Sequence, residues 1–175
     1  VYLDEIGTID YAEHVIEQYT TAFMAAIDAE AIRAANPYIA VDFANAPTSR
    51  VLAPILTRLN CQVVALNEAV DETKMSIPAQ DFQHSLQQLA KICEVLRTTM
   101  GVRLDVGGER VWVADCGGDV LKGTALAAAL TLMALRAHGG GTIAVPVSMP
   151  SVFEKLAAEY GGSVIRTRVS MRGLM

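Results

Sequence analysis

The stretch YIAVDFANAPTSRVLAPILTRLNCQVVALN, residues 38–67, decides the predicted fold of this chain. It begins and ends with a nearly continuous apolar run, which is typical of strands buried on both faces of a parallel sheet. Between the two runs, apolar residues recur on one face of a short helix: Val51, Leu52, Ile55, Leu56 and Leu59. A strand, a helix and a second strand in this order predict a βαβ unit with a right-handed crossover.

The neighbouring segments extend this pattern in both directions. Residues 9–35 have helical periodicity with a break near Asp28, and residues 80–100 form a second amphipathic helix. Residues 67–79 show neither period and predict a long loop, which in a compact domain indicates function or mobility. Residues 126–137 are rich in Ala and Leu on every side, so this helix is expected to be buried.

The complete order of elements predicts the fold class. Two short strands in a hairpin follow the helix that ends near residue 100, and a strand–helix–strand run follows residue 141. This order predicts an α/β protein, layered α/β/α, with a mainly parallel or mixed sheet. Composition shifts near residue 121, where we place a boundary. The predicted parts are a helical lead-in (1–36), an α/β/α domain (37–120) and the truncated first part of a further α/β/α domain (121–175).

Composition and charge narrow the function classes. With 52% hydrophobic residues, a net charge of −5 and no basic stripe, the chain does not match a nucleic-acid-binding surface. Its longest apolar helix is too short to span a bilayer, so no membrane partner is expected. Three cysteines without close spacing suit a reducing compartment, so we expect a cytoplasmic protein. The chain starts at Val1 without an initiator Met, which we interpret as a piece of a longer protein.

Charged residues crowd the turn of the hairpin formed by residues 100–115. Asp105, Glu109 and Arg110 lie within six positions around two glycines. One interpretation is a loop that binds a metal ion and a phosphate. The other is a solvated turn in which Arg110 pairs with a carboxylate, a contact worth about 0–1 kcal/mol. Asp42 and Asn45, at the end of the first strand, are likewise either site residues or, as we favour, turn residues that cap the next helix.

Several of these segments resemble the middle domain of the α-D-phosphohexomutases, the phosphomannomutases and phosphoglucomutases. In that family, a strand ending in Asp leads into an Asn-Gly turn and a helix, and Asp42 and Asn45 match those positions. A later strand enters the metal loop Asp-Gly-Asp-x-Asp-Arg, to which Asp105 and Arg110 align. Residues 140–170 resemble the first half of the family's third domain.

The resemblance implies a Mg²⁺ site held by Asp105 and Glu109, but this loop departs from the family pattern. Val106 replaces a glycine, Gly107 replaces the middle Asp, and Glu109 stands in place of the third Asp. The loop therefore offers two carboxylates at most to an ion that requires near-octahedral oxygen coordination.

The resemblance also implies residues that bind substrate. Arg110 at the end of the loop is expected to contact a phosphate group. Arg166, Arg168 and Arg172 form a small basic cluster in a region that lines the family's cleft, and Arg172 is the second expected substrate- or phosphate-binding residue. The alternative for the cluster is a solvated strand edge. None of the three histidines has a metal-ligand spacing.

The function implied for the longer protein is phosphoryl transfer on a hexose phosphate through a phosphoserine enzyme. The family's phosphoserine motif and fourth-domain phosphate loop are not found here, so these 175 residues are expected to be inactive alone. The alternative is a non-catalytic mutase-like module fused to a sugar-1-phosphate nucleotidyltransferase. Because a truncated third domain would leave sheet edges uncovered, we also expect a homodimer.

Overall fold

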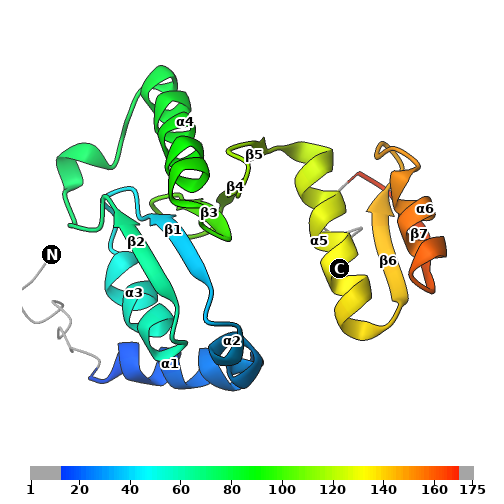
Figure 1. Cartoon of the computed structure of the whole chain (residues 1–175), viewed down its shortest axis with the longest axis horizontal. Helices are drawn as coiled ribbons and strands as arrows, with labels where there is room; N and C mark the ends of the chain where they lie inside the picture. Colours follow the sequence, from blue (N-terminus) through cyan, green and yellow to red (C-terminus); the bar gives the residue numbers. More distant parts are fainter. Residues whose placement is uncertain (1–12, 170–175) are drawn as a thin grey trace, which may run out of the picture.

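A mixed five-stranded sheet organises the first part of the chain (Figure 1). The computed structural model describes residues 13–169. The strand order is β2-β1-β3-β4-β5; β1 is parallel to β2 and β3, while β4 and β5 are antiparallel additions. The strands are β1 (Tyr38–Asp42), β2 (Gln62–Leu66), β3 (Met100–Leu104), β4 (Val111–Asp115) and β5 (Val120–Leu121). The predicted α/β class with a mixed sheet is confirmed.

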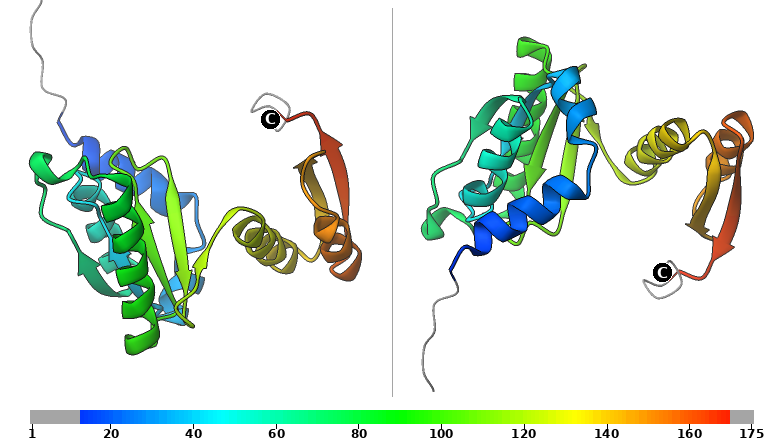
Figure 2. Two further views of the ribbon diagram at one scale, coloured as in Figure 1. Left: turned by 90° about the horizontal axis from the view of Figure 1, so that it is seen from above. Right: turned by 90° about the horizontal axis from the view of Figure 1, so that it is seen from below.

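Two helices cover opposite faces of this sheet (Figure 2). Helix α3 (Ser49–Arg58) packs on the face formed by Ile39 and Val41, and α4 (Ala79–Leu96) packs on the face formed by Ala40. Successive residues of β1 therefore point to opposite layers, which explains why this strand is apolar almost throughout.

The N-terminal helical segment is divided as its sequence predicts. Helix α1 (Val15–Ala25) and helix α2 (Ala29–Ala35) are separated at Asp28. The Asp28 carboxylate accepts a hydrogen bond from the backbone N–H of Ala31 at 2.9 Å and so caps α2. The part of the predicted helix before residue 13 lies outside the described residues.

The segment 67–79, predicted to be an unstructured loop, contains a short 3-10 helix, η2 (Glu72–Lys74). Asp71 begins it by accepting hydrogen bonds from the backbone N–H of Thr73 at 3.1 Å and from its hydroxyl at 2.6 Å. These hydrogen bonds hold the pKa of Asp71 below its ordinary value, and the bond from the Thr73 hydroxyl contributes most. The prediction missed this element because a single turn fixed by side-chain bonds has no hydrophobic period.

A second α/β unit follows β5. It contains α5 (Gly123–His138), β6 (Gly141–Pro146), α6 (Val152–Glu159) and β7 (Gly162–Thr167). Strands β6 and β7 are parallel neighbours in a separate two-stranded sheet. The unit stands apart from the first sheet, and the chain connects them through β5 and α5 (Figure 1). No helix among residues 13–169 combines the length and apolarity needed to cross a bilayer.

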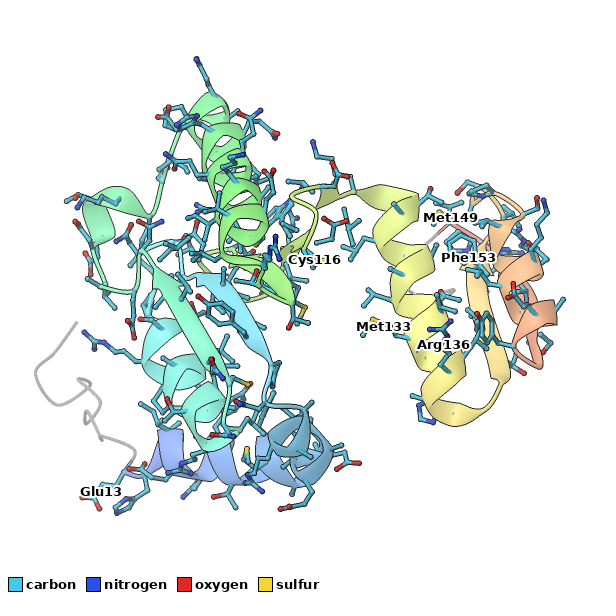
Figure 3. The ribbon with its side chains drawn as sticks, viewed as in Figure 1. Glu13, Cys116, Met133, Arg136, Met149 and Phe153 are labelled. Carbon is cyan, nitrogen blue, oxygen red and sulfur yellow. The ribbon has the colours of Figure 1, made fainter. Side chains whose placement is uncertain are left out.

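The prediction that residues 126–137 are buried is wrong. Within α5 only Leu135 is buried, while Leu130 and Met133 are 54% and 64% exposed. Helix α5 packs on α6 and β6, and Met133 points away from that contact (Figure 3). A two-stranded sheet is too small to bury a helix on more than one side. Helix α5 therefore has more apolar side chains than residues 13–169 cover.

Candidate functional site

The candidate site lies at the carboxyl ends of β1 and β3. From β1 the chain turns into α3 and reaches β2 on one side; it then crosses through α4 to β3 on the other side of β1. In open α/β sheets, a crevice for ligands forms where neighbouring connections diverge in this way. The loop after β1 and the turn after β3, residues 105–110, meet at this edge.

The turn after β3 is closed by its own aspartate. Oδ1 of Asp105 accepts hydrogen bonds from the backbone N–H groups of Glu109 at 2.7 Å and Arg110 at 3.0 Å. The Asp105 N–H donates to the carbonyl of Arg110, and the Gly108 N–H donates to the carbonyl of Asp105, both at 3.1 Å. Gly108 has a φ of 69°, and a Cβ there would lie 3.0 Å from the Thr48 side chain, so this position requires glycine.

The turn between β4 and β5 is closed in the same way. Oδ1 of Asp115 accepts the backbone N–H groups of Gly117 and Asp119, each at 2.9 Å. The Asp115 N–H also donates to the carbonyl of Asp119. In both turns, an aspartate at the end of a strand organises the hairpin by accepting backbone N–H groups.

The structure places the predicted metal and phosphate residues side by side. Glu109 and Arg110 are exposed, Asp105 is half-buried, and Arg110 forms no ion pair with any residue in the range 13–169. Arg172 lies outside the described residues. These side chains fit a Mg²⁺ ion poorly, because one Asp105 oxygen is already used in the turn and no three acidic, His or Cys side chains gather within the described part of the chain.

Asp42 is buried, and its role differs from helix capping. It is 1% exposed and accepts hydrogen bonds from the Ala44 N–H and from Nδ2 of Asn67, both at 2.9 Å. The residue at the start of α3 is Thr48, so the prediction that Asp42 caps this helix is wrong. Asp42 instead organises the turn immediately after β1 and ties it to the end of β2.

Asn45 connects the same turn to the segment after β2. Its backbone N–H donates to the carbonyl of Asn67 at 2.8 Å, and its side-chain Nδ2 donates to the carbonyl of Ala69 at 2.9 Å. Its own carbonyl accepts the N–H of Asp71 at 3.0 Å. Asn45 therefore fixes one loop of the crevice and does not cap a helix.

The sequence analysis did not identify Arg103, the central charged residue of this edge. Arg103 is 6% exposed, lies opposite Asp42 in the β1–β3 register, and donates through Nη1 to the Asp42 carboxylate. Its guanidinium lies 5.3 Å from the centre of the Phe82 ring, which contacts the Trp112 ring edge-to-face at 4.8 Å. The signal in the sequence that could have identified Arg103 is an arginine within an otherwise apolar strand.

Arg166 has a structural role in the second unit. It donates through Nε and Nη2 to the Glu154 carboxylate, each at 2.7 Å, and through Nη1 to the carbonyls of Pro146 at 3.0 Å and Met149 at 2.7 Å. The hydrogen bonds from Arg166 hold the pKa of Glu154 below its ordinary value. Arg166 thus links β7 to the start of α6, while Arg168 is exposed.

The site lies on a mixed sheet covered by helices on both faces. Residues 17–118 match the family model for phosphoglucomutase/phosphomannomutase, alpha/beta/alpha domain II, and the chain belongs to that family. It is 28% identical to a phosphoglucomutase/phosphomannomutase of Thermococcus kodakarensis, covering 95% of this chain and 36% of that protein. It is 26% identical to a phosphomannomutase of Methanocaldococcus jannaschii, covering 91% of this chain and 35% of that protein.

Solved structures share the fold. A putative phosphomannomutase from Thermus thermophilus superposes with a TM-score of 0.72 at 19% identity, over 94% of this chain and 38% of that one. A phosphoglucomutase/phosphomannomutase family protein from Burkholderia thailandensis superposes with a TM-score of 0.67 at 18% identity, over 91% of this chain and 34% of that one. The chain thus spans about a third of the length of the curated relatives it matches.

Proposed function

We propose that this chain serves as the second α/β/α domain, with the start of the third, of a phosphohexomutase-type protein acting on a hexose phosphate in the cytoplasm. The observation that carries the proposal is the family match over residues 17–118, together with the position of the 105–110 turn at the carboxyl edge of β3. The exposed guanidinium of Arg110 is available to a phosphate group at this edge. Arg172 is the second proposed phosphate contact.

Magnesium binding at this turn is proposed to be weak. A Mg²⁺ ion at such a place neutralises charge on a transferring phosphoryl group. Here the remaining oxygen of Asp105 and the carboxylate of Glu109 are the only acidic ligands of the turn, because Gly107 supplies none. The missing carboxylate also supports a second candidate function, a non-catalytic mutase-like module fused to a sugar-1-phosphate nucleotidyltransferase.

Isothermal titration with Mg²⁺ and Mn²⁺ tests the ligand count. The wild-type chain is expected to bind Mg²⁺ in the millimolar range or more weakly. A Cβ at Gly107 would meet only the Glu109 side chain, at 3.7 Å, so an added side chain fits without strain. The variant Gly107→Asp/Glu109→Asp is therefore expected to bind Mn²⁺ about tenfold more tightly, an added 1.4 kcal/mol.

The matched control is Gly107→Ala, which fills the same space without adding an oxygen ligand and should bind metal as the wild type does. Tight Mg²⁺ binding by the wild type would contradict the poor fit. Equal affinities for the double variant and the wild type would show that the turn is an ordinary hairpin.

Binding of the sugar phosphate tests the proposed function itself. A hexose 1-phosphate titrated into the chain is expected to shift the NMR signals of the 105–110 turn, and Arg110→Gln should abolish the shift while Arg58→Gln, at an exposed position on α3, should not. The chain alone is expected to interconvert no hexose phosphates. Shifts elsewhere but none at the turn would refute the role of Arg110.

A further inference from the structure

Strand β2 (Gln62–Leu66) is one of the two outer strands of the five-stranded sheet (Figure 1). The other outer strand, β5, has only two residues and lies between Asp119 and Lys122, and both features discourage pairing with a further strand. Strand β2 has five residues, and the stretch 61–66 contains no charged residue and no proline. The sheet therefore has one protected edge and one edge that is open to a further strand. We call the open one the β2 edge.

The outward main-chain groups of the β2 edge follow from its pairing with β1. The N–H of Gln62 donates to the carbonyl of Pro37 at 2.9 Å, and the carbonyl of Leu66 accepts an N–H from the residue after β1 at 3.0 Å. Since this direction alternates along a strand, Val63 and Ala65 point their N–H and C=O groups away from β1. The strand order places no neighbour on that side among residues 13–169.

An apolar groove follows the β2 edge on the face covered by α4. Helix α4 packs over β1, β3 and β4 and leaves β2 largely uncovered, and Val95 is 65% exposed. The groove has a volume of about 600 Å³, and its apolar lining comes from Leu66, Ile92, Val95 and Leu96. Its charged residues are already paired, Asp42 with Arg103 and Lys91 with Glu94. This groove suits aliphatic side chains.

A polar groove follows the same edge on the face covered by α3. Ala65 is exposed on this face, so α3 leaves the outer part of β2 open. The groove has a volume of about 560 Å³ and includes Arg50, Thr57 and Glu68 in its lining. Neither Arg50 nor Glu68 forms an ion pair within residues 13–169, and their charges are opposite. This groove therefore suits neutral polar side chains.

An extended peptide matches all three features. Its main chain repeats every two residues, as the outward groups of Val63 and Ala65 do, and its side chains alternate between the two grooves. A second copy of this chain fits less well. Pairing two β2 strands would bring two α3 helices together, and each carries Arg50 and Arg58 but no acidic residue.

We propose that the β2 edge binds an uncharged extended peptide as an added antiparallel strand. Aliphatic side chains of the peptide lie in the groove beside α4, and neutral polar side chains lie in the groove beside α3. Antiparallel pairing is the more stable arrangement, and directly opposite residues share a face, so the polar residues of the peptide bond to Val63 and Ala65. The β2 edge lies across β1 from β3 and its 105–110 turn, so this proposal and the proposed function can fail separately.

Amide hydrogen exchange of the 175-residue chain, followed by NMR, tests the bonds directly. The probe is the peptide acetyl-SLQVSLQ-amide. In the free chain, the N–H groups of Val63 and Ala65 should exchange faster than that of Gln62, which already has an acceptor. Millimolar peptide is expected to slow exchange at Val63 and Ala65 about tenfold and to leave Gln62 unchanged.

Two methylated peptides give a matched control on the wild-type chain. N-methylation at the third and fifth residues, which are polar, removes the donors that face β2 and should abolish binding. N-methylation at the fourth and sixth residues, which are aliphatic, adds the same two methyl groups on the outer side and should leave binding intact.

Variants of the chain test the edge and the apolar groove. Ala65→Pro removes one outward N–H without touching a bond to β1, a place where an edge strand accepts proline, and should weaken peptide binding about tenfold. Ala65→Ser keeps this N–H and should bind as the wild type does. Val95→Glu brings a charge beside the aliphatic side chains at a position that is exposed in the free chain, and should also weaken binding about tenfold.

Unchanged exchange at Val63 and Ala65 in millimolar peptide would overturn the proposal, as would equal binding of the two methylated peptides. Protection of both N–H groups without peptide, rising with chain concentration, would assign the β2 edge to a second copy and refute the peptide. If Ala65→Pro does not fold, the methylated peptides decide on the wild-type chain.

Discussion

Replacing Arg103 by Met is expected to destabilise the first α/β unit strongly. The change leaves the Asp42 carboxylate, whose side chain is 2% exposed, with the Ala44 N–H and the Asn67 amide as its remaining hydrogen-bond donors. Removing one partner of a buried ion pair costs about 3–5 kcal/mol, because the other charge stays buried and uncompensated. The two remaining hydrogen bonds place the expected loss toward the lower end, at about 3 kcal/mol.

The double variant Asp42→Asn/Arg103→Met distinguishes the net contribution of the ion pair from the cost of leaving one buried charge without a partner. It removes both charges while an amide retains acceptor capacity for the Ala44 N–H, so its loss is expected to be smaller than that of Arg103→Met by about 1–2 kcal/mol. Urea unfolding followed by Trp112 fluorescence measures both, since Trp112 lies on β4 beside the Phe82 ring and reports the first unit alone.

Two outcomes would refute this reasoning. A loss below about 1 kcal/mol for Arg103→Met would mean that Asp42 is effectively hydrated in the folded chain. A double variant less stable than Arg103→Met would mean that the pair adds more through packing and hydrogen bonding than its desolvation removes. The exposed replacement Arg58→Met serves as the control for the general effect of losing an arginine.

Three further results are expected. Gly101→Ala should lower the free energy of unfolding by about 1–3 kcal/mol, because its Cβ would overlap Sγ of Cys93; urea unfolding equal to that of the wild type would contradict the close packing of α4 on β3. The pKa of Glu154 is lowered in the folded chain by its hydrogen bonds with Arg166. Its contribution to stability is therefore present at pH values above the ordinary pKa of a glutamate and is lost as pH falls through the lowered pKa. Amide NMR of β7 as a function of pH should show this loss of stability on acidification in the wild type and not in Glu154→Gln. The chain is expected to form homodimers through the β6–β7 sheet, where Ile165 is 57% exposed; sedimentation should show dimers that Ile165→Lys dissociates, and a strict monomer at high concentration would exclude them.

The elements of the first unit could be predicted because each has a local cause. The buried strands β1 and β2 are continuous apolar runs, and the stop between α1 and α2 is set by a single capping side chain, Asp28. The exposure of α5 could not be predicted, because its composition does not reveal how small the neighbouring sheet is. Local periodicity determines the type of an element, while burial depends on what the rest of the fold brings against it.

The Asp42–Arg103 pair shows the same limit at the candidate site. The two residues are 61 positions apart, and they meet only because the chain crosses over through α4 to place β3 beside β1. The sequence shows a carboxylate at the end of one apolar strand and a guanidinium within another. Only the strand order and register make them partners, and neither follows from the hydrophobic pattern of either strand alone.

The departures from the family's metal loop reduce the number of oxygen ligands at this edge of the sheet. The turn lacks a middle carboxylate because Gly107 occupies that position, and Asp105 uses one of its oxygens to bind backbone N–H groups. Close to the same turn, the Nε of Arg103 is buried without an acceptor among residues 13–169. Fewer oxygen ligands weaken the preference of this edge for a divalent cation. Gly107→Asp should therefore strengthen Mn²⁺ binding at the turn, because it restores a carboxylate at the position of the missing ligand.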